Sequence, residues 1–147
     1  MTSAEPQTDN LEEETVEAPE PLLFSISFAR LAELNRSAIV LLAARRVPTC
    51  PSLDLPYSEL TDPQKLVNEI ADHFEDADGF ITSEMTIQEI LFRTLLARRN
   101  APTLLSDLHY ELTERWSTPV RPINVTEDGL RLILESDVYY GFAKVDP

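Results

Sequence analysis

The chain has 147 residues, of which 43% are apolar, and 26 acidic against 12 basic side chains give a formal net charge of −14. This length predicts about one domain with its own core, and the charge repels phosphate backbones and anionic membranes. The composition therefore weighs against a general nucleic-acid binder and favours basic partners. The single cysteine, Cys50, excludes an internal disulfide and a cysteine-based zinc cluster.

Residues 1–21 carry seven acids, three prolines, no base and no aromatic side chain. They bury too little apolar surface to offset the entropy of ordering, so we expect a disordered acidic tail. The tail is either a solubilising extension or a segment that attracts a basic partner, with its negative charges mimicking those of a nucleic acid. No secretory signal is visible, and the longest apolar run, residues 38–44, is far shorter than the roughly 20 residues that span a membrane. A cytoplasmic protein is expected.

Residues 22–84 are expected to form a helical region. Its first apolar side chains follow helical spacing, at Phe28, Leu31 and Leu34. Residues 38–44 are compatible with a buried strand or a buried helix, and their alanine content and the cations that follow favour a helix. Residues 47–57 hold three prolines, which predicts a loop on the surface.

A helix with clear boundary signals is expected after this loop. Thr61 or Asp62 can cap its start, and Pro63 suits its first turn. Gly79 suits a left-handed position at its end. The apolar stripe of this helix consists of Leu66, Val67, Ile70 and Phe74.

Residues 85–147 are expected to form a C-terminal unit that begins with two helices, and whether residues 22–84 form their own domain or pack on it is left open. Thr86 and Glu89 form a capping box at the start of the first. One side of the second helix carries Leu105, Leu108, Leu112 and Trp116.

The same unit is expected to end with a short strand, a third helix and a last strand. Two prolines favour an extended segment over residues 117–125, and Asn124 or Thr126 caps the helix that follows. Residues 138–145 are rich in β-formers and alternate. One face of this strand is expected to carry Val138, Tyr140 and Phe142.

Helices followed by an aromatic strand are the order of elements in a winged helix, so the expected fold class is mainly α with a small β wing (α+β). Residues 85–145 resemble the winged helix-turn-helix domain at the N-terminus of the bacterial RNA polymerase delta subunit, the HARE-HTH domain. Besides the first amphipathic helix, the resemblance lies in Ala101-Pro102-Thr103-Leu104-Leu105-Ser106-Asp107-Leu108 and Tyr140-Gly141-Phe142-Ala143-Lys144-Val145. It implies a role in transcription, with RNA polymerase or another transcription component as partner. Delta-like proteins carry their acidic tail after this domain, whereas here the tail precedes it.

The acidic turn at residues 74–85 is similar to a calcium-binding loop. With Gly79 at the sixth position, Asp76 and Asp78 take the third and fifth. The first and twelfth positions lack an oxygen ligand, and Glu84 comes one residue too early to supply the twelfth. We therefore favour a solvated helix end over a metal site made of Asp76, Asp78 and Glu84.

Catalysis is not expected. Only three glycines are present, far apart, so the sequence contains no phosphate-binding loop. His73 and His109 lack a second histidine or a cysteine at metal-ligand spacing, and no serine stands in a nucleophile motif. We expect neither an enzymatic activity nor a cofactor.

The charges of the expected third helix argue against insertion into the DNA major groove. Its polar side chains carry a net charge of −3, and it offers no Asn, Gln or Lys to contact base edges. These side chains are Glu127, Asp128, Arg131, Glu135 and Asp137.

The sequence therefore predicts a non-enzymatic, transcription-associated protein-interaction module whose acidic tail engages basic partners. The oligomeric state is left open. One alternative is a winged-helix DNA-binding regulator that uses the arginines, and a second is a protein that binds divalent metal through residues 74–84. The candidate partner-binding residues are Glu75, Asp76, Asp78, Arg98, Arg99, Arg115, Arg121 and Trp116.

Overall fold

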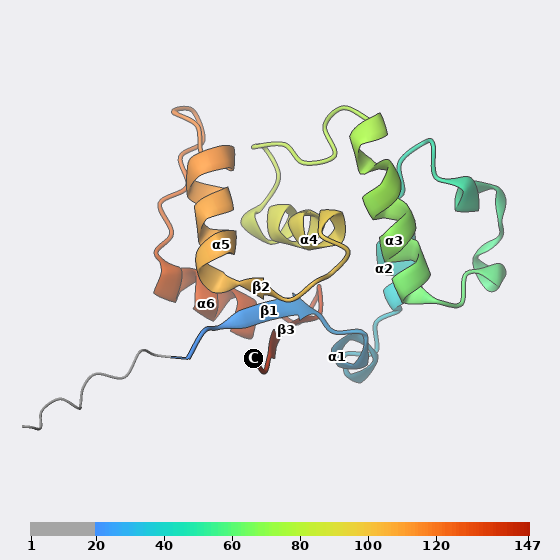
Figure 1. Ribbon diagram of the computed structural model, residues 1–147, viewed down its shortest axis with the longest axis horizontal. Helices are drawn as coiled ribbons and strands as arrows, with labels where there is room; N and C mark the ends of the chain where they lie inside the picture. Colours follow the sequence, from blue (N-terminus) through green and yellow to red (C-terminus); the bar gives the residue numbers. More distant parts are fainter. Residues whose placement is uncertain (1–19) are drawn as a thin grey trace, which may run out of the picture.

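The computed structural model describes residues 20–147, a mostly helical chain with one small three-stranded antiparallel sheet (Figure 1). This confirms the expected fold class at the level of helices with a small sheet. The expected acidic tail, residues 1–21, lies outside the described residues except for Glu20 and Pro21.

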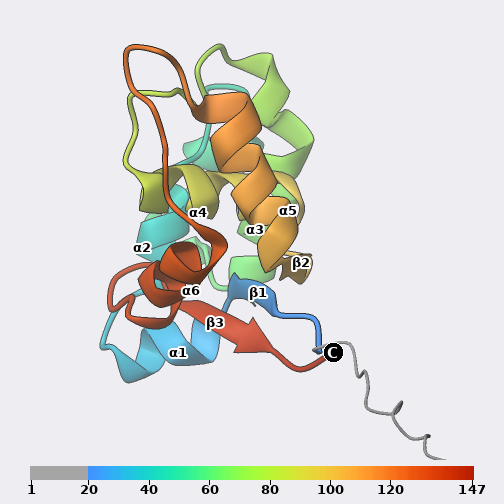
Figure 2. The same cartoon turned by 90° about the vertical axis from the view of Figure 1, so that its left-hand side faces the viewer.

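The sheet joins three segments that lie far apart in the sequence. Strand β1 (Leu23–Ile26) is central and pairs antiparallel with both β2 (Thr103–Leu104) and β3 (Phe142–Val145). Leu23 lies opposite Leu104 on one side and Val145 on the other, so both termini of the described chain lie at the same end of the sheet (Figure 2). The region expected to be helical, residues 22–84, therefore begins with a strand that the sequence analysis did not predict.

Two short helices follow β1, as the sequence predicts. Helix α1 (Phe28–Glu33) is capped by Ser27, whose Oγ accepts a hydrogen bond from the Arg30 amide at 3.0 Å. Helix α2 (Ala38–Ala43) is capped in the same way by Ser37, at 3.1 Å. Of the two alternatives for residues 38–44, a buried strand and a buried helix, the helix forms.

The proline-rich loop contains two 3₁₀ turns, Pro51–Asp54 and Tyr57–Glu59, and leads into α3 (Pro63–His73). Asp62 caps α3 by accepting from the amides of its first turn. The helix ends at His73 and tightens into a 3₁₀ turn over Phe74–Asp76. Gly79, with φ at +78°, takes the left-handed conformation expected of it.

The second half of the chain supplies three more helices. Helix α4 (Ile87–Ala97) is capped by Thr86. Helix α5 (Leu105–Tyr110) continues without interruption into a π-helical turn over Glu111–Trp116. Helix α6 (Glu127–Glu135) is capped by Thr126, one of the two residues expected to do so.

The short strand expected at residues 117–125 lies elsewhere. That segment is an irregular loop closed by local hydrogen bonds, because the Ile123 amide donates to the Ser117 hydroxyl (2.8 Å) and the Arg121 amide to the Thr118 hydroxyl (2.9 Å). Its two prolines also lack the N–H that a sheet requires. The short strand is β2, between α4 and α5.

The last strand begins at Phe142, four residues later than expected. Residues 138–141 instead turn around the buried side chain of Asp137, whose carboxylate accepts hydrogen bonds from the amides of Tyr139, Tyr140, Gly141 and Phe142 at 2.8–3.2 Å. The rings of Tyr140 and Phe142 still stack, with centroids 5.4 Å apart. Val138, expected on the same face, is 67% exposed.

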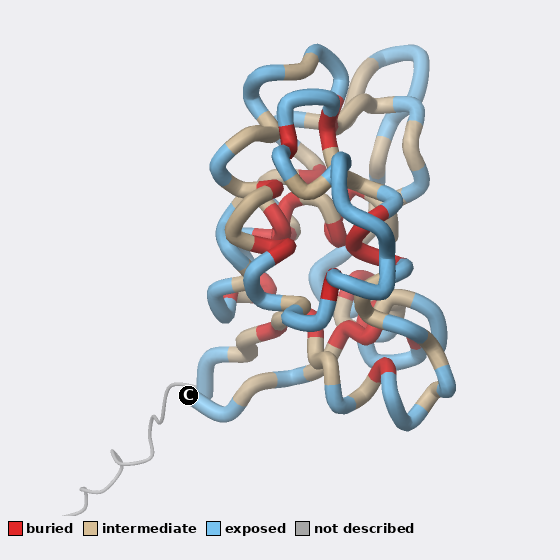
Figure 3. The backbone as a smooth tube through the Cα atoms, turned by 90° about the vertical axis from the view of Figure 1, so that its right-hand side faces the viewer, coloured by how far each residue is buried: buried red, intermediate tan, exposed pale blue. Residues whose placement is uncertain are grey.

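One hydrophobic core holds the described chain together, and it draws on both residues 22–84 and residues 85–147. Helix α4 lies between α3 and α5 in Figure 1 and contributes six buried side chains. Most of the turns that connect the helices are exposed or half-buried, and the buried residues lie in the interior (Figure 3). The buried side chains of α4 are Ile90, Leu91, Phe92, Thr94, Leu95 and Leu96.

Candidate interaction surfaces

Four of the residues selected from the sequence line one groove: Glu75, Arg98, Arg115 and Trp116. This groove, of ≈ 460 Å³, lies between the 3₁₀ turn after α3, the last turns of α4 and the π-helical turn after α5. We call it the Trp116 groove. Its apolar lining comes from Phe74, Ala77, Phe80, Ile81 and Ala97.

The aromatic wall of the groove is fixed by the acidic turn that folds back after α3. The rings of Phe74 and Phe80 pack with centroids 5.5 Å apart. The left-handed Gly79 between them permits this reversal, since a residue with a side chain rarely adopts that conformation. Arg93 then holds the turn, because its Nη1 donates to the Phe80 carbonyl at 2.8 Å.

Two arginines of the groove share one acid without a hydrogen bond to it. The Glu111 carboxylate lies 3.8 Å from Arg98 Nη2 and 3.6 Å from Arg115 Nη1. Both distances are longer than a hydrogen bond. Arg115 also lies over the Trp116 ring, 5.4 Å from its centroid.

Trp116 is half-buried and packs against the core, but its indole N–H has no acceptor. The Nε1 atom is shielded from solvent and finds no hydrogen-bond partner among the described residues. A buried N–H without an acceptor is uncommon and costs free energy. Trp116 lies at the end of a π-helical turn, a local conformation that is often found at functional positions.

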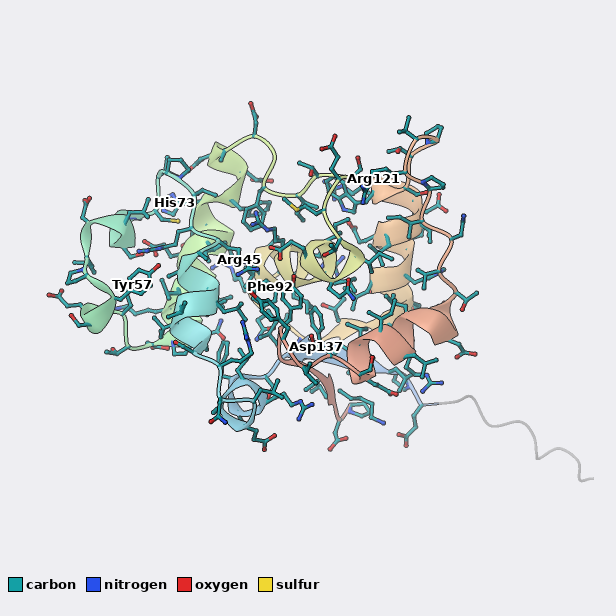
Figure 4. All side chains as sticks on the ribbon, turned by 180° about the vertical axis from the view of Figure 1, so that it is seen from behind. Arg45, Tyr57, His73, Phe92, Arg121 and Asp137 are labelled. Atoms are coloured by element: carbon teal, nitrogen blue, oxygen red, sulfur yellow. The ribbon has the colours of Figure 1, made fainter. Side chains whose placement is uncertain are left out.

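Arg99 and Arg121, also selected from the sequence, lie outside this groove. Arg99 pairs with Asp72 of α3 across an exposed surface. Arg121 stands in the loop after the π-helical turn, at one end of the molecule (Figure 4), beside a second depression of ≈ 330 Å³. The arginines therefore do not form one basic patch, which weakens the case for a phosphate-binding surface.

The acidic turn does not gather its carboxylates around one point. Asp76 accepts a hydrogen bond from the Thr49 hydroxyl at 2.8 Å and lies 3.1 Å from His73 Nδ1, and these two contacts lower the pKa of Asp76. Asp78 and Glu84 are exposed. Among residues 20–147, no group of three or more His, Cys, Asp or Glu side chains is placed to hold a metal ion.

A second surface combines acids with exposed apolar side chains. On α6, helical spacing places Asp128, Leu132, Glu135 and Ser136 on one face, and Leu132 is 59% exposed. Ser136 also lines a shallow depression with Val138 and Tyr139 of the following turn, which are 67% and 43% exposed. We call these six residues the α6 face.

The α6 face is both acidic and held in place. Arg131 is the one base within Glu127–Glu135. It forms ion pairs with two acids of the same helix, Asp128 at 3.8 Å and Glu135 at 3.2 Å, so it is not available to pair with a partner. The Tyr139 ring is held by Arg36, whose guanidinium carbon lies 3.7 Å from the ring centroid. A fixed aromatic ring beside exposed aliphatic side chains is typical of protein-binding surfaces.

Asp137 does not contribute to the outer surface of this helix, contrary to our expectation. It lies two residues beyond α6 and is 9% exposed, with its carboxylate turned toward the backbone amides of the following turn. The net charge of −3 expected for this helix therefore becomes −2, from three acids and one base between Glu127 and Glu135.

The structure also contains a cluster of charged groups that the sequence did not reveal. Glu89 was expected to complete a capping box, and its amide does donate to the Thr86 hydroxyl. Its carboxylate turns instead to three partners from different parts of the chain: Arg45 (2.8 and 3.0 Å), Arg93 (2.6 Å) and the Tyr140 hydroxyl (2.8 Å). Glu89 and Arg45 side chains are only 15% and 11% exposed.

These contacts shift two pKa values in opposite directions. Burial acts to raise the pKa of Glu89, but the hydrogen bonds from Arg45, Arg93 and Tyr140 outweigh it and lower that pKa to about 2. Burial, followed by the hydrogen bond to Glu89, raises the pKa of Tyr140 to about 12. Arg45 also lies beside the Phe92 ring at the centre of the molecule (Figure 4), so this cluster ties α2 to α4 and is structural.

The proline-rich loop and α3 enclose a third depression of ≈ 510 Å³ at the end of the molecule where Tyr57 lies (Figure 4). It is lined by apolar side chains of the loop and α3, with Lys65 and three acids at its margin. One of these acids, Glu69, is already bonded to the amide and hydroxyl of Ser52, at 2.7 and 2.6 Å.

Comparisons with protein-family models, with curated protein sequences and with solved structures find no match for this chain. Among the described residues, no helix combines the length and apolar character that crossing a membrane requires.

Proposed function

We propose that this chain is a non-enzymatic protein-interaction module that docks a basic partner on its α6 face. The observation that carries the proposal is the exposure of Leu132, Val138 and Tyr139 on a surface whose helix carries three acids against one base, Arg131. Exposed apolar side chains stabilise a complex when a partner covers them and removes them from water. The acids beside them favour a partner whose apolar contact surface is surrounded by Lys or Arg.

The arrangement of elements supports a winged-helix-like architecture for this module. The order α4, β2, α5, α6, β3 is the helix, strand, helix, helix, strand order of that fold, with α6 in the place of the recognition helix. The third strand of the sheet is supplied by β1, from the other end of the chain. The resemblance to the delta-subunit domain implies that the partner is RNA polymerase or another transcription component.

The charge of α6 favours protein over DNA as the partner of this architecture. A helix with three acids and one base is repelled by the phosphates that line a major groove. Residues 1–21 add seven acids and no base to the charge of the chain. A basic protein surface is attracted by both features.

The proposal is tested by capture of partners from extracts of the native cell with variants of the α6 face. Leu132→Ser combined with Val138→Ser is expected to reduce the partner captured by the wild type about tenfold or more. Leu53→Ser with Leu55→Ser is the matched control, because these leucines are also exposed, at 45% and 43%. The same partner retained at the same level by both double variants would contradict the proposal.

The acidic tail and the DNA alternative are tested separately. Glu12→Gln, Glu13→Gln and Glu14→Gln together are expected to weaken capture at low salt more than at high salt, because exposed charges are screened. A labelled DNA duplex at about 150 mM salt is expected to show no shift with the wild type. A shift that is lost when Arg98, Arg99, Arg115 and Arg121 are neutralised would instead support the DNA-binding alternative.

A further inference from the structure

The Trp116 groove presents two accessible guanidinium groups. Arg98, Arg115 and Trp116 line the same groove, and the two guanidinium groups lie 3.8 and 3.6 Å from their acidic neighbour Glu111. Glu111 lies between the two arginines but beyond hydrogen-bond distance of both, and the Arg98 and Arg115 side chains are 38% and 67% exposed. Two accessible guanidinium groups favour a ligand that carries a carboxylate.

The position of the arginines at helix ends explains their charge but not the groove. Arg98 follows the last residue of α4, where a cation is stabilised by the helix dipole. The dipole gives no reason for the Trp116 indole N–H to be buried without an acceptor. Nor does it account for the aromatic wall of Phe74 and Phe80 on the opposite side of the groove.

The shape and lining of the groove limit the class of ligand. Its volume of ≈ 460 Å³ falls within the range of ~300–1,000 Å³ that is typical of ligand-binding clefts. Its aromatic and aliphatic lining suits an apolar side chain, and its arginines suit a carboxylate. Glu75 and Glu111 at its margin disfavour a ligand with several negative charges, such as a nucleic acid.

We propose that the Trp116 groove binds a linear segment of a partner protein in which an aromatic or aliphatic side chain precedes a single carboxylate. The apolar side chain packs against Phe74, Phe80 and Trp116. The carboxylate accepts charge-assisted hydrogen bonds from Arg98 and Arg115. This site is separate from the α6 face and selects the opposite charge, so it goes beyond the function proposed above.

The single tryptophan of the chain allows a direct test on the full-length protein, because Trp116 reports binding by its own fluorescence. The probe is the acetylated and amidated pentapeptide Ser-Leu-Phe-Glu-Ser, and its control carries Gln in place of Glu. The Glu peptide is expected to change the emission of Trp116 in a saturable way, with a Kd of about 0.1–1 mM. The Gln peptide is expected to bind about tenfold more weakly or not measurably.

Variants then assign the effect to the groove. Arg98→Gln and Arg115→Gln are each expected to weaken binding of the Glu peptide about tenfold, because each removes a charge-assisted hydrogen bond. Arg131→Gln on α6 removes the same charge at a distant position and is expected to leave the Kd unchanged. Equal affinity for the Glu and Gln peptides, no binding of either up to about 5 mM, or an equal loss with Arg131→Gln would overturn the proposal.

Discussion

The Glu89 carboxylate accepts two parallel hydrogen bonds from the Arg45 guanidinium, at 2.8 Å to Oε1 and 3.0 Å to Oε2. This bidentate pair joins the end of α2 to the first turn of α4 in a largely buried position. A buried charge that loses its partner is costly, so each member depends on the other for its contribution to stability.

The first prediction is that Glu89 makes the protein sensitive to acid. Its pKa is about 2 in the folded protein against an ordinary 4.5, so its stabilisation is fully present above pH 4.5 and is lost as the pH falls through 2. This difference corresponds to a free energy of unfolding on the order of 3 kcal/mol. At pH 7, Glu89→Gln should be less stable than the wild type by about that amount. Near pH 2 the difference between the two proteins should be much smaller, as measured by denaturant unfolding.

The matched control for this prediction is Glu33→Gln, because the Glu33 side chain is 71% exposed and pairs only loosely with Arg30. It should unfold with the same pH dependence as the wild type. If Glu89→Gln and the wild type lose stability in parallel between pH 4.5 and 2, Glu89 is not the group responsible.

The second prediction concerns the alkaline range. Burial and the hydrogen bond to Glu89 raise the pKa of Tyr140 to about 12, so its stabilising contribution is complete below pH 10 and is lost as the pH rises through 12. Tyr140→Phe keeps the ring contacts with Phe92 and Phe142 but should cost about 1–2 kcal/mol at pH 7. Its stability should then depend less on pH between 10 and 12, measured by circular dichroism.

Tyr110→Phe is the control for Tyr140→Phe, because Tyr110 is 65% exposed. Removal of the Tyr110 hydroxyl should change neither the stability of the protein nor its unfolding at alkaline pH. A wild-type protein whose absorbance shows every tyrosine ionising together near pH 10, with the fold intact, would contradict the prediction.

The sequence predicted the elements whose signals are local. The caps at Asp62, Thr86 and Thr126, the apolar stripe of α3 and the left-handed Gly79 each depend on residues within one or two turns. Strand β1 also carries a local signal, the alternation of Phe24 and Ile26 with serines, but it is short and the helical spacing that follows it is the stronger pattern.

The sequence could not predict what depends on contacts between distant segments. Whether residues 103–104 or 117–125 form the short strand is decided by their pairing with β1, about 80 residues earlier in the chain. Likewise, Arg45 and Tyr140 meet Glu89 only in the folded chain. Glu75, Arg98, Arg115 and Trp116 were selected one by one, and no sequence pattern indicates that they line one groove.

The third prediction tests the link between α4 and the central strand. Asn100 accepts a hydrogen bond from the Ile26 amide (2.7 Å) and donates one to the Ile26 carbonyl (2.8 Å), from a left-handed backbone with φ at 60°. Asn100→Gly keeps that backbone but should cost about 2 kcal/mol through the two lost hydrogen bonds. Asn100→Ala should cost about 1 kcal/mol more, because alanine rarely adopts this conformation.

Thermal and denaturant unfolding of the two Asn100 variants separates these contributions. Equal stability of the glycine and alanine variants would show that the backbone conformation contributes nothing at this position. A glycine variant as stable as the wild type would show that the two hydrogen bonds to Ile26 do not stabilise the fold.

The fourth prediction compares two glycines that share a left-handed backbone but differ in their surroundings. A Cβ on Gly141 would lie 2.6 Å from Leu31 Cγ, with φ at +82°, whereas a Cβ on Gly79, with φ at +78°, would meet only Thr82 Cγ2 at 3.5 Å. Gly79→Ala should therefore cost about 1 kcal/mol for the backbone alone. Gly141→Ala should cost about 2–4 kcal/mol, because Leu31 is fully buried and the overlap displaces α1 from β3. Denaturant unfolding measures both, and equal losses would mean that α1 moves aside without cost.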